Sequence, residues 1–379
     1  MTSPTSERLN ALIAQSTGAQ QAFLAALVKV PSDNPPGDCA PHAAAAAALL
    51  EDLGFTVERH VVPADLVTAA GMVTATNLIV RHRFGEGPTV ALNAHGDVVP
   101  PGAGWTQDPY GAAIVDGKMY GRGVAVSKSD FATYAFALDA LKRSGLPLKG
   151  TVELHFTYDE EIGGEVGPGW IISQGLTKPD YVLSAGFAYG VVVAHNGCLH
   201  LEDAYRATLP ALVSQVDGIG SPQITVGLIS GGINTNVVPD RVTFRLDRRI
   251  VPEENPEGVE AEVRDVIAQA AARFPAARVS VRQILLARPL VPDDASLRMA
   301  EIIRRNAAEV LGEEIRAHGV PLYTDARLYA EAGFPVVLYG AGPRTIEEAS
   351  GHRADENLRL TDLTLATRVV AATLAELLA

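Results

Sequence analysis

Apolar runs and helical repeats alternate along the first half of the chain. The stretches TVALNAHGDVV (89–99) and GTVELHFTYDEE (150–161) are apolar runs that end in polar residues, as buried strands do. Between them, FATYAFALDALKRSG (131–145) carries apolar residues at helical spacing and stops at a glycine. This alternation continues to about residue 196. Strands that alternate with helices predict an α/β domain with a largely parallel central sheet.

The pattern changes near residue 197, where apolar and polar residues begin to alternate within each predicted strand. Such strands have one exposed face, and together with two amphipathic helices they predict a small α+β sandwich of βαββαβ order. The expected elements are strands at 198–204, 222–232, 240–250 and 278–285, and helices at about 204–216 and 257–273.

The α/β pattern returns at about residue 288, with helices expected over 294–311 and 361–378. We therefore expect residues 1–196 and 288–379 to form one α/β domain. Residues 197–287 would form a second domain, inserted in a loop of the first.

Composition narrows the class of protein and its partners. A chain of 379 residues that is 47% hydrophobic can bury a large core. The net charge of −13 and the lack of Lys/Arg runs argue against nucleic acid or a membrane surface as a partner. The only cysteines are Cys39 and Cys198, and neither a signal peptide nor a membrane-spanning segment is evident. These features predict a soluble cytoplasmic protein.

Candidate chemical groups follow two of the predicted strands. His95 and Asp97 form an H-x-D pair, in which a carboxylate can fix the tautomer of a metal-binding imidazole. Asp159, Glu160 and Glu161 are three adjacent carboxylates, and such neighbours can divide cation binding and proton transfer between them. The carboxyl ends of parallel strands are where open α/β sheets place their sites. Taken alone, each motif is more typical of a solvated polar loop than of a site.

Four further residues merit attention. His352 lies in a Gly-flanked polar loop, and His195 follows an apolar strand with no carboxylate nearby in sequence, so we interpret His195 as structural. Asn236 and Arg249 lie in a Gly/Asn loop and on the strand after it. An amide and a guanidinium are suited to gripping a carboxylate, although a hairpin turn with a surface arginine is the simpler interpretation.

Taken together, these motifs resemble the M20 family of metallopeptidases and amidohydrolases. The resemblance covers nearly the whole chain and implies a zinc-binding α/β domain, an inserted lid domain that dimerises, and hydrolysis of an amide bond beside a carboxylate. The matching stretches are NAHGDVVPPGAGWTQDPYGAAIVDGKMYGRGVAVSKSD (93–130), TYDEEIGG (157–164), GGINTNVVPDRVTFRLDRR (231–249), TDARLYAEAGFPVVLYGAG (324–342) and GHRADENL (351–358).

The same resemblance implies roles for individual residues. His95 matches a metal-binding histidine and Asp97 its orienting partner, while Glu160 matches the general base that acts on metal-bound water. Glu161 and His352 match two further metal ligands. Asn236 and Arg249 match residues that hold the substrate carboxylate.

Three departures from the family pattern change the expected metal content. Val126 stands where the family has an aspartate that bridges two metals, and Gly186, or a residue within one of it, stands where the family has an acidic ligand. The segment 202–219 is much shorter than its counterpart, which would carry a lid histidine. With the bridge absent, a second ion would lie too close to the first without a ligand between them.

The sequence therefore predicts a hydrolase with one Zn²⁺ held by His95, Glu161 and His352, which is the ligand number of a catalytic zinc site. Its substrate would be an N-acyl amino acid or small peptide with a carboxylate, and it would form a homodimer through the lid. One alternative is a protein of the same fold that binds a carboxylate ligand without hydrolysis. Another is metal-free acid–base chemistry by Glu160 with Lys128.

Overall fold

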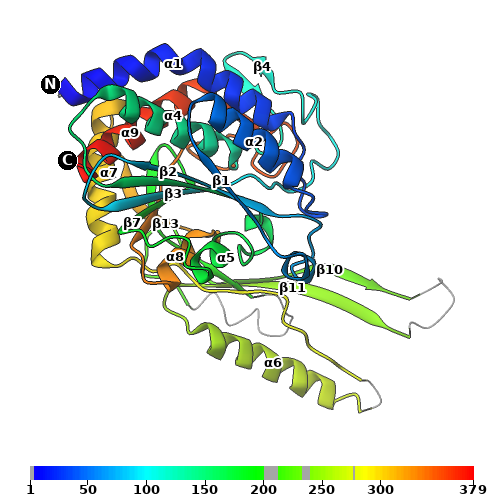
Figure 1. Cartoon of the computed structure of the whole chain (residues 1–379). Coiled ribbons are helices and arrows are strands. Elements are labelled where there is room, and N and C mark those ends of the chain that lie inside the picture. Colours follow the sequence, from blue (N-terminus) through cyan, green and yellow to red (C-terminus); the bar gives the residue numbers. More distant parts are fainter. Residues whose placement is uncertain (1–3, 200–211, 233–239, 276–277) are drawn as a thin grey trace. The chain divides into compact units, whose positions relative to one another are not determined.

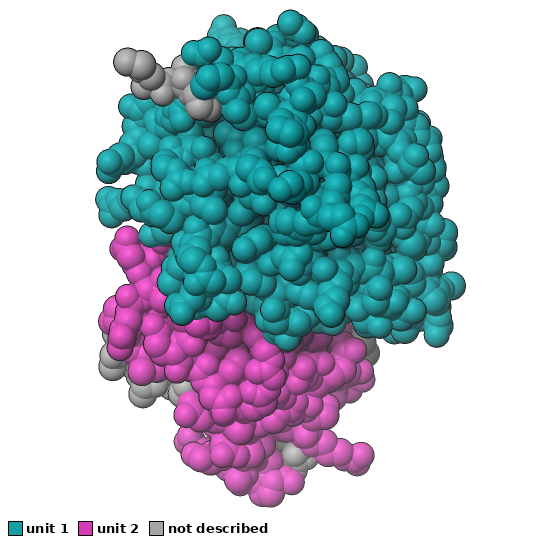
Figure 2. Space-filling view, turned by 60° about the vertical axis from the view of Figure 1, so that its left-hand side comes forward, with its two compact units in different colours: residues 1–193, 292–317, 328–379 teal, residues 194–291, 318–327 magenta. Residues whose placement is uncertain are grey.

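A computed structural model of the chain describes residues 4–199, 212–232, 240–275 and 278–379 (Figure 1). The chain separates into two compact units, which Figure 2 shows in different colours. The first unit comprises residues 1–193, 292–317 and 328–379, and the second comprises residues 194–291 and 318–327. Each is described by itself below.

Helices and strands alternate along the first unit as the sequence pattern predicts. Its helices are α1 (Pro4–Val28), α2 (Ala40–Asp52), α3 (Ala64–Ala69), α4 (Lys128–Ser144), α5 (Pro168–Ser173), α7 (Asp294–Leu311), α8 (Ala326–Glu331), α9 (Leu360–Leu377) and the short 3-10 helix η1 (Glu160–Ile162). Its strands are β1 (Val57–Val61), β2 (Thr76–Arg83), β3 (Thr89–His95), β4 (Ala113–Val115), β5 (Lys118–Tyr120), β6 (Thr151–Thr157), β7 (Tyr181–Ser184), β8 (Gly190–His195), β13 (Arg316–Val320), β14 (Val336–Leu338) and β15 (Asn357–Arg359).

An eight-stranded sheet with the order β1-β2-β6-β3-β7-β14-β8-β13 organises this unit. The four neighbours β6, β3, β7 and β14 run parallel, whereas β1, β2 and β8 pair antiparallel with their neighbours. His95 at the end of β3 is in register with Thr157 at the end of β6. The carboxyl ends of the four parallel strands therefore share one edge of the sheet, and the polar residues that follow them gather there.

The core of the first unit lies between the sheet and helices that cover it. Figure 1 shows α1, α2, α4 and α9 over one face of the sheet. Helix α4 is buried on nearly all sides, and its buried residues include the polar Lys128, Ser129 and Asp130 of its first turn as well as the apolar residues that follow. A separate three-stranded sheet, β15-β5-β4, brings the segment before α9 against the hairpin at 113–120.

The second unit is a four-stranded sheet with the order β10-β11-β9-β12 and one described helix. Its elements are β9 (Gly197–Leu199), β10 (Gln223–Gly231), β11 (Val242–Ile250), α6 (Pro256–Ala272) and β12 (Leu286–Ala287). Helix α6 contributes Val259 and Val263 to a small core with Ile224, Leu246 and Ile250. The expected strands at 222–232 and 240–250 and the helix at 257–273 are therefore present within one or two residues.

Two expected elements of the second unit are wrong where the structure describes them. Residues 212–216, the end of the helix expected at 204–216, are not helical, and 204–211 lie outside the described residues. Residues 278–285 form no strand and are mostly exposed; the strand that forms is Leu286–Ala287, which pairs with β9. Alternating polarity at 278–285 satisfies the pattern of a strand, but a strand also needs a hydrogen-bonded neighbour.

None of the helices within the described residues is long and apolar enough to cross a membrane.

Candidate metal site

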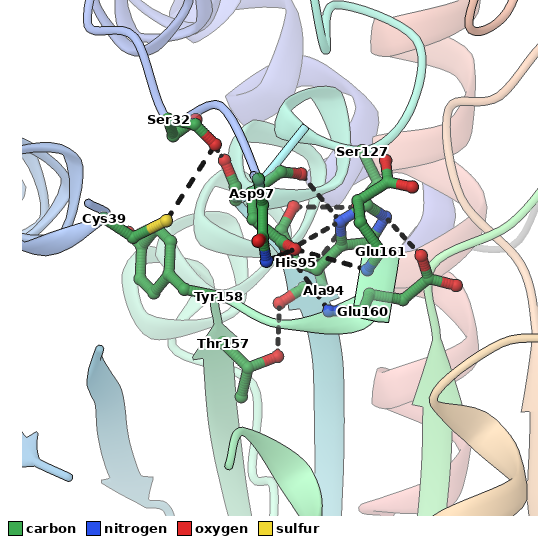
Figure 3. Close-up of polar contacts among 12 residues, drawn as sticks. Ser32, Cys39, Ala94, His95, Asp97, Ser127, Thr157, Tyr158, Glu160 and Glu161 are labelled. Carbon is green, nitrogen blue, oxygen red and sulfur yellow. Dashed lines mark hydrogen bonds and ion pairs between the residues drawn. The ribbon is translucent and has the colours of Figure 1, made fainter. Parts of the chain in front are cut away.

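The carboxyl ends of β3 and β6 bring three candidate ligands together, as Figure 3 shows. His95 Nε2 lies 3.9 Å from Glu160 Oε2. One ligand atom from each of His95, Glu160 and Glu161 lies within 4.8 Å of the others. Within the described part of the chain, this is the only group of three or more such side chains close enough to hold a metal ion.

Asp97 fixes the geometry of this group. Nδ1 of His95 lies 3.0 Å from the main-chain oxygen of Asp97 and 3.3 Å from its Oδ1. The same carboxylate accepts hydrogen bonds from the main-chain N–H groups of Glu160 (3.3 Å) and Glu161 (3.2 Å). A proton on Nδ1 leaves the Nε2 lone pair free for a cation, so Asp97 is placed to orient the imidazole, as the sequence predicts.

His352 approaches the group from a loop far along the chain. Its Nε2 lies 3.4 Å from Glu161 Oε1. That oxygen is buried, the Glu161 side chain is only 7% exposed, and apart from this ion-pair contact the oxygen makes no hydrogen bond among the described residues. A buried carboxylate with so few donors is costly unless positive charge, from an imidazolium or a metal cation, satisfies it. The donors present therefore fit a zinc-type ion: two imidazole nitrogens and carboxylate oxygens.

The concentration of carboxylates alters the protonation of the site. Burial, opposed by His95 and assisted by Glu161 and Asp97, raises the pKa of Glu160 to about 8. Burial alone would lower the pKa of His95, but Glu160, Asp97 and Glu161 together raise it well above its ordinary value. The contact with Glu161 raises the pKa of His352. The site thus attracts positive charge, either protons or a metal cation.

Two residues that the sequence analysis did not single out support the site. Asn34 Nδ2 donates to Asp97 Oδ2 at 3.0 Å, and Ser127 Oγ accepts from the main-chain N–H of His95 (3.2 Å) and donates to its main-chain oxygen (3.1 Å). Asn34 begins the sequence NPPG, and its prolines and glycine are typical of a turn. Nothing in the sequence indicated that the Asn34 side chain would contact Asp97.

Two other candidates, Lys128 and Arg249, make contacts of their own. Lys128 is fully buried, and its Nζ donates to the main-chain oxygens of Leu27 (3.4 Å) and Val30 (3.2 Å). Asn236 lies outside the described residues. Arg249 is at the end of β11 in the second unit, where it forms an ion pair of 2.9 Å with Asp247.

The chain is similar to known proteins over most of its length. The family model described as peptidase family M20/M25/M40 matches residues 91–376. Succinyl-diaminopimelate desuccinylase of Rhodospirillum centenum is 30% identical, over 83% of this chain and 86% of that protein. The enzyme of the same name from Gluconacetobacter diazotrophicus is 29% identical, over 93% of this chain and 95% of that protein.

Solved structures show the same fold. Human carnosine dipeptidase 1 has a TM-score of 0.79 at 16% identity and covers 100% of this chain and 99% of its own. An M20 family metallo-carboxypeptidase from Sulfolobus solfataricus has a TM-score of 0.74 at 17% identity and covers 94% of this chain and 98% of its own. These likenesses confirm the predicted α/β architecture.

The match over 91–376 and the relatives that span most of both chains establish the family that the motifs predicted. This chain belongs to peptidase family M20/M25/M40 and is a hydrolase of peptide or amide bonds.

Proposed function

We propose that this protein is a zinc-dependent amidohydrolase that cleaves an amide bond in an N-acyl amino acid or a small peptide. The observation that carries the proposal is the convergence of His95, Glu160 and Glu161, whose ligand atoms lie within 4.8 Å of one another. His352, 3.4 Å from Glu161, adds a second imidazole.

His95, Glu161 and His352 would hold the ion, which leaves Glu160 for proton transfer. Zinc in such a site would act as a Lewis acid toward the carbonyl and would make a water molecule more acidic. His95 is held from both sides, because its ring Nδ1–H donates to Asp97 and its main chain exchanges hydrogen bonds with Ser127. The ligands are therefore positioned before an ion arrives, as catalysis by a preorganised site requires.

Glu160 is the group best placed to move the proton. Its main-chain N–H is fixed by Asp97, so its side chain projects from the start of η1 toward His95. Burial and the neighbouring carboxylates, partly offset by His95, raise the pKa of Glu160 to about 8, so this carboxyl holds a proton readily. It would take a proton from water as general base and return it to the leaving amine as general acid.

The substrate class is supported by the relatives and by Arg249. The two relatives described above are named for removing succinyl from diaminopimelate, and that substrate is an N-acyl amino acid. By the family resemblance, Arg249 and Asn236 would hold a substrate carboxylate. Because Arg249 already pairs with Asp247, that carboxylate would have to share or displace an existing partner.

The test is turnover of N-succinyl and N-acetyl amino acids and of dipeptides, with and without chelator. We expect zinc-dependent turnover of at least one class. Glu160→Gln should lower kcat by about 10²–10⁴ while zinc is still bound, because only the proton acceptor is lost. Glu165→Gln, in the same loop but exposed, is the matched control. Full activity of Glu160→Gln would refute the assignment.

The replacement of two family ligands by Val126 and Gly186 favours a second candidate function. In this alternative the protein binds a carboxylate ligand and does not hydrolyse it. Calorimetric binding of N-acyl amino acids to chelator-treated protein, without turnover when zinc is restored, would favour this alternative.

We also infer that the second unit serves as the lid and as the contact of a homodimer. Ile229 and Phe244 are paired across β10 and β11 and are 71% and 47% exposed, and Val242 beside them is 55% exposed. Such an apolar surface is typical of a contact between proteins. Light scattering should give twice the chain mass, and Ile229→Asp should give monomer. A monomeric wild type would contradict this inference.

A further inference from the structure

The first observation concerns Gly186, in the segment after β7. A β-carbon at Gly186 would lie 2.8 Å from Tyr339 N and 2.9 Å from Leu338 C, which are main-chain atoms at the end of β14. The main-chain oxygen of Gly186 also accepts a hydrogen bond from Gly342 N at 2.9 Å. Main-chain atoms of a central strand cannot give way cheaply, so no side chain, and hence no carboxylate ligand, fits at this position.

The second observation concerns Asp130, in the first turn of α4. Its side chain is buried, and its Oδ1 accepts a hydrogen bond of 2.7 Å from Ala341 N. A β-carbon at Gly340 would overlap Asp130 Oδ1. The hydrogen bond from Ala341 therefore ties the start of α4 to the segment after β14, and one oxygen of the Asp130 carboxylate already has a main-chain donor.

The third observation concerns Val126, just before α4. Its main-chain N–H donates to Glu356 Oε1 at 3.2 Å, and Glu356 forms a fully buried ion pair of 2.6 Å with Arg122. One methyl group of Val126 lies 3.8 Å from where a β-carbon of Gly351 would be, next to His352. An apolar group, held by a rigid main chain, thus faces the loop that carries this ligand.

We propose that this site holds a single divalent cation, and that Val126, Gly186 and Asp130 form a wall where a second ion would need ligands. This inference rests on the proposed function, because it concerns the same site. Two ions about 3.5–4 Å apart need an anionic bridge and further ligands to offset their repulsion. None of the three residues offers a free ligand: Val126 has methyl groups, Gly186 has no side chain, and the Asp130 carboxylate already accepts a hydrogen bond from Ala341. Asp130 is a positioning residue, because it holds the wall and does not contact the ion.

The first test counts ions. Protein dialysed against buffered zinc is analysed for metal content, and affinity is measured by competition with a chromophoric chelator. We expect one equivalent for the wild type and also for Val126→Asp, which should bind that ion at least about tenfold more tightly through a new carboxylate. Val126→Asn, of similar size and uncharged, should bind as the wild type does. A second equivalent in the wild type or in Val126→Asp would overturn the proposal.

The second test concerns Asp130. Asp130→Ala should weaken zinc binding by about tenfold or more and change the visible spectrum of the cobalt-substituted protein, since α4 also positions Ser127 against His95. Asp139→Ala, on the same helix and paired with Arg143, is the control and should change neither. If Asp130→Ala does not fold, Asp130→Asn is used in its place, because it keeps an acceptor for Ala341. It should lower zinc affinity and change the cobalt spectrum in the same direction, but by less. Unchanged affinity and spectrum would overturn the positioning role.

The outcomes separate this inference from the proposed function. One equivalent of zinc with no turnover of any substrate would refute the hydrolase and leave the single-ion site intact. Two equivalents with zinc-dependent turnover would refute the single-ion site and support the hydrolase. Protein that binds no zinc would refute both.

Discussion

The two halves of one sheet edge use their polar groups in opposite ways. After β3 and β6, His95, Glu160 and Glu161 converge, and a buried carboxylate oxygen of Glu161 has an ion-pair contact with His352 but no further hydrogen-bond donor among the described residues. After β7 and β14, the buried carboxylate of Asp130 accepts a hydrogen bond from the main-chain N–H of Ala341. The first half can take a cation, whereas the carboxylate of the second half joins α4 to the segment after β14. A buried acid therefore does not by itself indicate a binding site. What matters is whether the protein already supplies hydrogen-bond donors to its carboxylate oxygens.

The largest expected effect concerns the buried ion pair between Arg122 and Glu356, which holds the main chain at Val126. Arg122→Ala leaves the Glu356 carboxylate buried without its partner, and we expect a loss of about 3–5 kcal/mol in the free energy of unfolding. Urea denaturation should show this loss to be the same with and without zinc, because the pair lies outside the ligand set. A loss that zinc fully reverses would mean that the two halves are not separate.

A second prediction uses pH to separate the halves. Burial raises the pKa of Asp130 from 3.8 to about 7, so between these pH values the folded state binds more protons than the unfolded state. The contribution of this group to stability is therefore greatest below pH 4 and falls by about 3–4 kcal/mol as pH rises to 7. Asp130→Asn should remove this part of the pH dependence, measured by urea denaturation. Zinc affinity should show the opposite trend and rise with pH, because its ligands must lose protons.

The third prediction concerns zinc itself. At a zinc concentration about 100 times the dissociation constant, binding should add about 2.7 kcal/mol to the stability of the protein. His352→Ala should lose most of this increment, because it removes one ligand. Gly340→Ala, in the other half, should destabilise the protein by about 1–3 kcal/mol through the clash with Asp130, and zinc should stabilise this variant less than the wild type because Asp130 is displaced. Thermal unfolding with and without chelator checks both results.

The smallest expected effect concerns the hydrogen bond from Asn34 that holds the Asp97 carboxylate. Asn34→Ala removes one hydrogen bond to a buried carboxylate and should cost about 1–2 kcal/mol. Zinc affinity should fall by about tenfold, as is usual for groups that orient a ligand. Gln20→Ala is the matched control, since Gln20 is a buried amide that donates to Thr367 far from the site. Equal effects of the two variants on zinc affinity would contradict the assignment.

The strands that carry the site were predictable because their signals are local. Apolar runs that end in His95 or in Asp159, Glu160 and Glu161 show where two strands stop, and parallel pairing then brings their ends together. The motif around His352 needed the family resemblance, because its loop has no periodic pattern. The family and the α/β architecture were confirmed, while the roles of the individual residues stay predictions.

Other features depend on contacts that no local pattern shows. Asp130 stands directly before the helix predicted at 131–145. Only the structure shows that it belongs to the first turn of α4 and accepts a hydrogen bond from the main-chain N–H of Ala341. Gly186 was noticed as a missing ligand, but the close approach of β14 that forbids a side chain there was not visible. The expected strand at 278–285 failed for the same reason, since alternating polarity does not reveal whether a neighbouring strand is present.

Residues 194–291, the long insertion that makes up most of the second unit, contribute none of the four groups that converge at the metal site. On the proposed function, they contain both candidates for gripping the substrate, Asn236 and Arg249. A mutation in that contiguous quarter of the gene can therefore alter which acyl compound is accepted while leaving the ion and its ligands untouched. Exchanging this stretch between relatives offers a direct route to new selectivity.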